Sequence, residues 1–172
     1  MSERVANGMR VVPDFPKPGI QFLDITPVLA DATLLRDLIA ELAAPWRSAG
    51  VTHVVGVESR GFILAAPVAM ALGAGFVPIR KPGKLPWKTL QREYALEYGS
   101  GSLELHADAI PDGSRVLIVD DVLATGGTAA AACALVEQAG GSVVGCSFLL
   151  GIEVLRGIRN LEGRVVERLV TA

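Results

Sequence analysis

Cysteine and histidine, the residues that most often hold structural metals, are scarce in this 172-residue chain. It contains two cysteines, Cys133 and Cys146, and two histidines, His53 and His106, which stand far apart in the sequence. Two cysteines cannot build a disulfide framework or a four-thiolate zinc site. We therefore expect neither a disulfide-stabilised fold nor a structural metal.

An excess of charge of either sign is also missing. The 16 lysines and arginines against 18 aspartates and glutamates leave a net charge of -2, and 51% of the residues are hydrophobic. A nucleic-acid-binding face is usually strongly basic, and a disordered chain is usually poor in hydrophobic residues. This composition indicates one globular domain with a sizeable core and no nucleic-acid partner.

The chain lacks a long uninterrupted hydrophobic segment as well. Residues Gly61 to Ile79 carry no charge and approach the roughly 20 residues of a transmembrane helix, but Pro67, Gly73 and Pro78 break the run. The N-terminal sequence MSERVANGMR has no apolar core of the kind that a signal peptide needs. We therefore expect a cytoplasmic protein without a membrane partner.

The sequence does contain alternating strand and helix patterns. Asp31 fits a helix N-cap, and leucines and isoleucines then recur at helical spacing until Ser48 to Gly50. Further apolar runs predict strands at Val51–Val57, Phe76–Ile79, Arg115–Val119 and Ser142–Leu150, and helices after Gly61 and over Thr128–Ala139. This alternation predicts an α/β domain with a mostly parallel sheet.

Two other regions have weaker patterns. After a basic loop at Arg80 to Arg92, the partly alternating runs REYALEYG and SLELHA flank Ser100-Gly101 and predict a hairpin or mobile flap. The tail from Gly151 to Ala172 predicts a short helix and an edge strand, and it carries no indication of function.

The clearest chemical signal is the sequence VDDVLATGGT, from Val119 to Thr128. Its glycines let backbone N–H groups approach an anion, the following helix start adds positive potential, and Thr125 and Thr128 offer hydroxyls. Asp120 and Asp121 would repel a phosphate but accept hydrogen bonds from a sugar diol. We predict a ribose 5-phosphate site. An ordinary N-cap beside a spare surface acid is the alternative, but it explains neither the second acid nor the glycine pair.

Other familiar motifs are absent or incomplete. There is no P-loop sequence, and Pro78 stands where a dinucleotide fingerprint would need its third glycine. The turn around Ser59 resembles a hydrolase nucleophile elbow, but Val57 replaces the first glycine of that motif. A hydrolase is the second class of function left open, although His53 and His106 fit structural or surface roles better than that of a catalytic base.

Basic residues form the third feature. Arg60 follows a strand end, where a second anion can dock, and Arg80, Lys81, Lys84 and Lys88 lie close together in the chain. Alone, these lysines would indicate a solvated loop. Next to a phosphate site they predict a polyphosphate subsite, which needs several cations.

These segments resemble a known family. The run VLIVDDVLATGGT (Val116 to Thr128) resembles the phosphoribosyl pyrophosphate (PRPP) motif of the type I phosphoribosyltransferases. Order and spacing from Asp14 to Leu150 resemble the members that use adenine, through DFPKPGIQFLDITPVL (Asp14 to Leu29), VGVESRGF (Val55 to Phe62), IRKPGKLP (Ile79 to Pro86) and ALEYG (Ala95 to Gly99).

The resemblance implies one phosphoribosyltransferase domain over residues 1–172, with a mostly parallel twisted sheet flanked by helices. It also implies a small N-terminal hood at about residues 1–30 and a mobile flap at about 88–106. The implied reaction is purine salvage, in which adenine and PRPP give AMP and pyrophosphate. Mg²⁺ would arrive on PRPP, with no direct protein ligand, and the protein would be a homodimer in which Arg80 reaches the neighbouring site.

The resemblance also implies roles for individual residues. It places the ribose hydroxyls on Asp120 and Asp121, and the 5-phosphate on Ala124, Thr125, Gly126, Gly127 and Thr128. It places pyrophosphate on Glu58, Ser59, Arg60, Arg80, Lys81 and Lys84, with a cis peptide between Glu58 and Ser59.

Adenine is assigned to Gln21, Phe22 and Leu23, with the Gln21 carbonyl accepting from the 6-amino group and the Leu23 N–H donating to N1. Some members have arginine at the position of Leu23, a minor departure because the contact is made by the backbone. Glu97, in the flap, matches the family's acid/base candidate. Glu97 and Arg60 are the two expected catalytic residues.

Two other classes remain open. A transcriptional regulator on this fold would bind PRPP without catalysis, but it needs an added DNA-binding region, and only thirteen residues precede the first matched segment. An enzyme for 6-oxo purines or xanthine would share the PRPP motif and differ in the base-binding segments.

Overall fold

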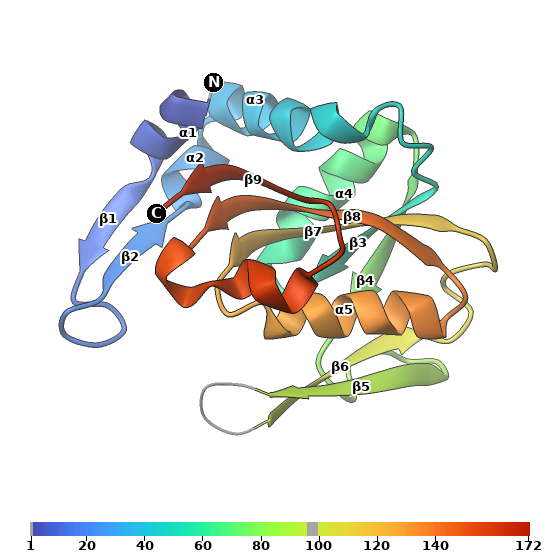
Figure 1. Cartoon of the computed structure of the whole chain (residues 1–172). Helices are drawn as coiled ribbons and strands as arrows, with labels where there is room; N and C mark the ends of the chain where they lie inside the picture. Colours follow the sequence, from blue (N-terminus) through green and yellow to red (C-terminus); the bar gives the residue numbers. More distant parts are fainter. Residues whose placement is uncertain (1, 96–99) are drawn as a thin grey trace.

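A five-stranded parallel sheet forms the centre of the protein in the computed structural model, which describes residues 2–95 and 100–172 (Figure 1). The strand order is β4-β3-β7-β8-β9. The bounds are β3 His53–Val57, β4 Gly75–Ile79, β7 Arg115–Leu123, β8 Ser142–Gly151 and β9 Val166–Thr171. The α/β architecture predicted from the sequence is confirmed.

Helices cover both faces of this sheet (Figure 1). One face is covered by α1 (Ser2–Gly8), α2 (Thr26–Ala30), α3 (Ala32–Ala43) and α4 (Arg60–Leu72). Trp46 of the 3₁₀ helix η1 (Ala44–Trp46) is buried in the same core. On the opposite face lies α5 (Gly127–Gln138). Because successive strand residues point to opposite faces, Val54 joins the first core and Val55 the second.

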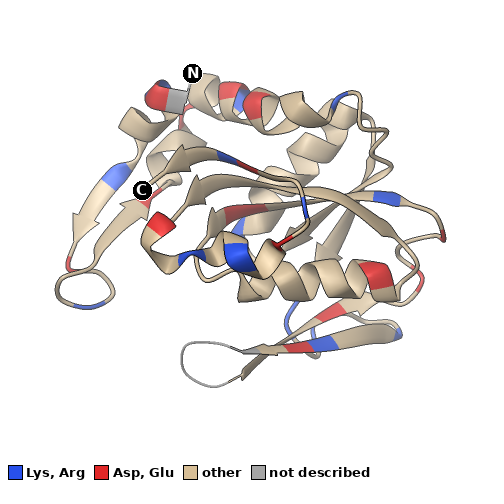
Figure 2. Cartoon of the chain, viewed as in Figure 1, with Lys and Arg blue, Asp and Glu red and all other residues tan. Residues whose placement is uncertain are grey.

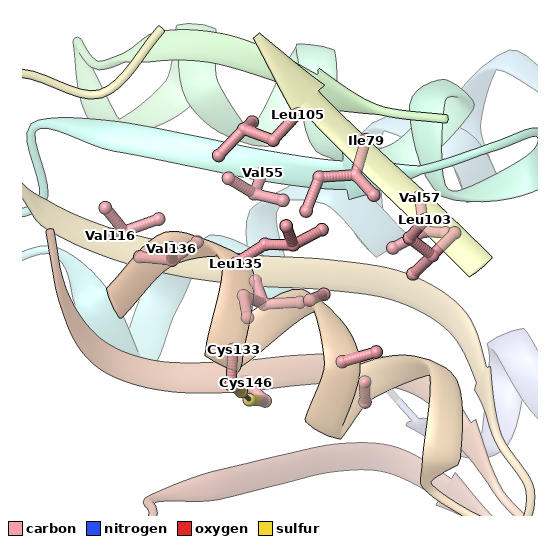
Figure 3. Close-up of a cluster of buried hydrophobic side chains, with 14 of the residues drawn as sticks. Val55, Val57, Ile79, Leu103, Leu105, Val116, Cys133, Leu135, Val136 and Cys146 are labelled. Carbon is pink, nitrogen blue, oxygen red and sulfur yellow. Dashed lines mark hydrogen bonds between the residues drawn. The ribbon is translucent and has the colours of Figure 1, made fainter. Parts of the chain in front are cut away.

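The core beneath α5 contains both cysteines (Figure 3). Cys133 on α5 and Cys146 on β8 are buried free thiols whose Sγ atoms lie 3.7 Å apart. Aliphatic side chains from the sheet surround them. The two cysteines therefore act as small apolar residues that fill the helix–sheet interface.

Helix α3 begins where the sequence predicted. The Asp31 side chain accepts hydrogen bonds from the backbone N–H groups of Thr33 and Leu34, at 2.8 and 2.9 Å. The helix ends at Ala43, earlier than expected, because Pro45 turns the next residues into η1. Buried leucines and isoleucines on its inner face hold it against α4 and the sheet.

The predicted hairpin exists, but its turn is elsewhere. Strands β5 (Thr89–Ala95) and β6 (Ser100–His106) pair with Ala95 opposite Ser100, so Ser100-Gly101 belongs to a strand. A Cβ on Gly101 would lie 2.6 Å from the Tyr94 ring. The glycine therefore marks a close cross-strand approach, and the sequence signal was misread as a turn. Strand β5 also begins inside the expected loop.

Strand β7 is longer than expected. Its pairing with β8 continues through Asp120 opposite Phe148 and Val122 opposite Leu150. The two aspartates that were predicted to follow the strand are therefore part of it, held by ladder hydrogen bonds. The sequence pattern missed this because polar residues in a buried strand usually indicate that the strand has ended.

The N-terminal hairpin and the C-terminus of the chain lie close together. Strands β1 (Arg10–Pro13) and β2 (Gln21–Asp24) form an antiparallel hairpin, and the C-terminus lies near it (Figure 1). The tail forms two short 3₁₀ helices, η2 (Glu153–Leu155) and η3 (Gly157–Leu161), where one short helix was predicted. The predicted edge strand is confirmed as β9.

Acidic and basic segments are intermixed along these elements (Figure 2). Within the described residues, no helix combines the length and apolarity that a membrane crossing requires.

Candidate active site

A cleft of about 1030 Å³ opens where β3 and β7 end, bounded on one side by the β1–β2 hairpin. Most of the residues that the sequence selected line it: Gln21, Phe22, Leu23, Glu58, Ser59, Arg60, Lys81, Asp120, Asp121, Ala124, Thr125, Gly126 and Thr128. Gly127, Arg80 and Lys84 are near but not part of its lining. Glu97 lies outside the described residues.

The loop after β7 presents the start of α5 to the cleft. Gly126 is the N-cap residue, with φ of 81°, and no side chain caps the helix. That φ suits glycine, and the uncapped backbone N–H groups in the first turn need an acceptor from elsewhere. An anion at this helix start would meet both the donors and the positive end of the helix dipole.

The two aspartates of β7 have different surroundings. Asp121 is buried and accepts a hydrogen bond from the Arg60 guanidinium at the start of α4. Asp120 accepts from the backbone N–H of Asp121 at 2.9 Å. Burial, reinforced by the neighbouring Asp121 charge, raises the pKa of Asp120 well above its ordinary value.

Close packing holds Asp120 in place. A Cβ on Gly61, in the first turn of α4, would lie 2.7 Å from Asp120 Oδ1. The glycine therefore leaves room for the carboxyl between strand and helix. It is a structural requirement of the site that the sequence motifs had not assigned.

Glu58 contacts the basic residues that follow β4. Arg80 Nε donates to Glu58 Oε2 at 3.1 Å, the Lys81 backbone N–H donates to the same oxygen at 3.2 Å, and Lys84 Nζ lies 3.5 Å from Oε1. Burial opposes ionisation of Glu58, but the hydrogen bonds from Lys81 and Arg80 and the nearby charges outweigh it and lower the pKa of this carboxyl. The Glu58–Ser59 peptide bond is cis, as expected.

Strand β2 contains Gln21 to Leu23, the segment to which the family resemblance assigns adenine. Phe22 lines the cleft and contacts Phe15 edge to face, with ring centroids 5.1 Å apart. Asp24 accepts from the Thr26 N–H at 2.9 Å and from its hydroxyl at 2.8 Å, which ends the strand. These hydrogen bonds lower the pKa of Asp24. The strand is thereby fixed at its carboxyl end by Asp24, and the Phe15 ring packs against it at Phe22.

The sequence missed the contribution of the tail. Ile152, Glu153, Val154 and Ala172 line the cleft, and the Asn160 side-chain amide donates to the Thr125 carbonyl at 2.7 Å. No motif marks these residues. The only cue in the sequence is that β8 runs parallel to β7, so its carboxyl end must reach the same edge of the sheet.

The part of the chain that the structure describes does not assemble a hydrolase site. Neither histidine belongs to the cleft lining that contains Ser59. His53 Nδ1 lies 3.0 Å from the Thr52 hydroxyl, and the described residues contain no group of three or more potential metal-ligating side chains. Within residues 2–95 and 100–172, neither histidine is therefore placed to act as a base for Ser59, and the hydrolase alternative receives no support.

Comparison with known proteins agrees with this geometry. A family profile described as the phosphoribosyl transferase domain matches residues 28–164. The adenine phosphoribosyltransferase of Myxococcus xanthus is 58% identical over 163 residues, covering 95% of this chain and 89% of that protein. The chain belongs to the adenine phosphoribosyltransferase family.

Solved structures of the family are similar throughout. The adenine phosphoribosyltransferase of Rhodothermus marinus has a TM-score of 0.94 at 53% identity, covering 99% of this chain and 98% of that one. The Saccharomyces cerevisiae enzyme, solved with adenine and an imino-altritol bisphosphate, has a TM-score of 0.92 at 39% identity and covers 98% and 97%. The type I phosphoribosyltransferase fold is thus confirmed.

Proposed function

We propose that this chain transfers the 5-phosphoribosyl group of PRPP to adenine, giving AMP and pyrophosphate in purine salvage. One observation carries the proposal: a single cleft contains, side by side, the edge of β2, the two aspartates of β7 and the open start of α5. These are three recognition surfaces for a base, a ribose and a phosphate. Family membership supports the same reaction.

Adenine would bind along β2. Pro13 pairs with Gln21 and has no N–H, which favours a non-hydrogen-bonded pair there and, two residues on, between Val11 and Leu23. Residues in such pairs direct their N–H and C=O groups away from the partner strand. The Gln21 carbonyl and the Leu23 N–H are then available to accept from the 6-amino group and to donate to N1, with Phe22 beside the ring.

The ribose 5-phosphate would occupy the middle of the cleft. Asp120 and Asp121 accept from the ribose hydroxyls, and the loop Ala124 to Thr128 donates backbone N–H and hydroxyl groups to the 5-phosphate. Asp120 is partly buried, and this burial raises its pKa, so its carboxylate gains from hydroxyl donors that replace lost water.

Pyrophosphate would leave toward the cations. We assign it to Ser59, Arg60 and Lys81, which line the cleft, with Glu58, Arg80 and Lys84 as the surrounding group. Departure of pyrophosphate leaves positive charge on the anomeric carbon, so stabilising the leaving anion lowers the barrier. Arg60 is therefore proposed as a catalytic residue. Arg80 is proposed to extend toward the site of a second subunit.

Mg²⁺ is proposed to enter as part of the PRPP substrate. The described residues offer no cage of three or more acidic, histidine or cysteine ligands, but Asp120 and Asp121 face the same cleft. Mg²⁺ typically keeps several waters and binds substrate phosphates, so PRPP itself would hold the ion, with the two carboxylates nearby and no direct protein ligand. When bound, the ion supplies charge neutralisation of the pyrophosphate.

Proton transfer is assigned to Glu97 on the strength of the motif alone. It would handle the proton displaced from the purine ring, within a flap at residues 88–106 that closes over the reacting sugar and excludes water. Residues 1–30 would form the hood that holds the base, so that the whole chain acts as one domain.

A homodimer is proposed from an exposed apolar surface on α4 and β4. Ile63, Met70 and Phe76 are 46%, 83% and 37% exposed. Phe76 packs edge to face on Phe62, with ring centroids 5.9 Å apart, and so connects the two elements. Exposed apolar surface of this kind is typical of an interface, and we assign it to a second copy of the chain.

The reaction is tested by incubating the protein with adenine, PRPP and Mg²⁺ and quantifying products by chromatography. We expect AMP and pyrophosphate in equal amounts, and none when ribose 5-phosphate replaces PRPP. Asp120→Asn/Asp121→Asn is the matched control, because each charged hydrogen bond is worth about 1.5 to 3 kcal/mol. Absence of AMP from the unmodified protein, or full activity in the double variant, would overturn the assignment.

A further inference from the structure

The segment between β8 and β9, to which the sequence assigned no role, lies directly against the proposed phosphate loop. A Cβ on Gly157 would lie 2.1 Å from the Ala124 carbonyl oxygen and 2.9 Å from the Gly126 nitrogen. From the other side, a Cβ on Gly126 would lie 2.2 Å from the Gly157 carbonyl oxygen. The two backbones therefore touch at a point where neither accommodates a side chain.

A directed hydrogen bond accompanies this contact. Asn160 Nδ2 donates to the carbonyl oxygen of Thr125 at 2.7 Å. A trans peptide carries its N–H on the side opposite its C=O. Holding the Thr125 carbonyl toward η3 therefore points the Gly126 N–H from the opposite edge of that peptide unit, away from Asn160.

The same segment is anchored independently of the loop. Leu161, one residue after Asn160, is buried in the core beneath α5, while Asn160 itself is exposed. Further along, the guanidinium of Arg164 donates to Glu137 on α5 at 2.7 Å. The donor of the Thr125 hydrogen bond therefore sits on a fixed support and not on a free chain end.

We propose that Asn160 and Gly157 are positioning residues for the 5-phosphate, acting through the backbone of Ala124 to Gly126. This inference rests on the proposed function and adds a second layer to it. In the ligand-free protein the loop donors need a fixed orientation, because the helix start has no side-chain cap to organise them. Asn160 supplies that orientation from outside the cleft.

The proposal makes a substrate-specific prediction. The 5-phosphate is present in PRPP and in AMP, but not in adenine or pyrophosphate. Asn160→Leu keeps the size of the side chain and removes the donor, so we expect KM to rise about 3- to 10-fold for both PRPP and AMP, in line with loss of one hydrogen bond. KM for adenine and for pyrophosphate should stay within about 2-fold.

Two further variants make the test sharper. Asn7→Leu, on an exposed position of α1 outside the cleft lining, is the matched control and should leave all four KM values unchanged. Gly157→Ala forces the tail away from Ala124 and should raise the same two KM values further. Melting temperatures of all variants separate these effects from general loss of folding.

Unmodified protein is measured first, with all four substrates in the forward and reverse directions. If it does not convert adenine and PRPP, the proposed function fails and the variants are not needed. If it is active, equal changes in all four KM values for folded Asn160→Leu, or no change in any of them, would overturn the positioning role alone.

Discussion

The guanidinium of Arg60, at the start of α4, donates a hydrogen bond to the carboxylate of Asp121 on β7. The proposed roles give these residues different ligands, pyrophosphate for Arg60 and a ribose hydroxyl for Asp121. In the ligand-free protein they satisfy each other. On these roles, binding of PRPP exchanges this partly buried hydrogen bond for contacts with the substrate. In the empty site, the pair leaves neither charge unpaired.

Stability should respond unequally to loss of the two partners. The Asp121 side chain is 9% exposed, and the Arg60 side chain is 52% exposed. Removing Arg60 therefore leaves a buried carboxylate without its partner, whereas removing Asp121 leaves a solvated cation. We expect Arg60→Gln to lower the free energy of unfolding by about 1 to 3 kcal/mol and Asp121→Asn by clearly less. Urea unfolding followed by circular dichroism measures both, and equal losses would contradict this asymmetry.

Asp120 should lower the stability of the folded protein while it supports turnover. Its folded-state pKa is raised, so above that pKa folding must bury an ionised carboxylate, and the cost disappears as the pH falls through it. Asp120→Asn should therefore raise Tm at pH 8, because an amide at this position carries no charge to desolvate.

The gain from Asp120→Asn should shrink as the pH is lowered toward the ordinary value of 3.8, while turnover falls at every pH because the ribose contact is weakened. Melting curves between pH 4 and 8 provide the measurement. A variant that is less stable than the unmodified protein at pH 8 would show that Asp120 is not strained by burial.

Lys81 and Lys84 should differ in importance. Lys81 lines the cleft, and its side chain makes no ion pair with the described residues. Lys84 pairs with Glu58 outside the lining. We expect Lys81→Ala to raise KM for PRPP and pyrophosphate by about 10-fold or more, and Lys84→Ala by less than about 3-fold. Steady-state kinetics of the two variants measure this difference. A larger rise in KM for Lys84→Ala than for Lys81→Ala would show that the lysines exchange roles when substrate binds.

The sequence predicted which residues line the cleft better than it predicted the bounds of the strands that carry them. The run from Val119 to Thr128 and the strand alternation were sufficient to place aspartates, glycines and a helix start at one sheet edge, because each has a local physical signature. The length of β7 was not predictable, since the ladder with β8 that holds Asp120 in the strand depends on residues far along the chain.

Contacts made across long sequence separations were also missed. Gly101 was interpreted as a turn residue, although its role is to admit the Tyr94 ring across the hairpin. Gly157 and Asn160 carry no motif, and only the folded chain shows them against the phosphate loop. The Arg60–Asp121 pair joins positions whose motifs were assigned to separate ligands.

Oligomeric state provides another prediction. Met70 is 83% exposed and is the most exposed apolar residue of the α4–β4 surface, so Met70→Glu should split the proposed dimer into monomers of 18.0 kDa. Val165→Glu, 58% exposed before the opposite edge strand β9, is the control and should remain dimeric. Light scattering coupled to size exclusion gives both masses, and a monomeric unmodified protein would remove the dimer from the account.

The most direct test of the account is the specificity constant kcat/KM for adenine, hypoxanthine, guanine and xanthine at saturating PRPP. A 6-oxo purine presents an acceptor to the Gln21 carbonyl and an N–H donor to the Leu23 N–H, so both contacts on β2 would be mismatched. At roughly 1 to 3 kcal/mol for each mismatch, adenine should be favoured by about 10² to 10⁴-fold. A 6-oxo purine that matches or exceeds adenine would contradict the assignment of β2 as an adenine-reading edge.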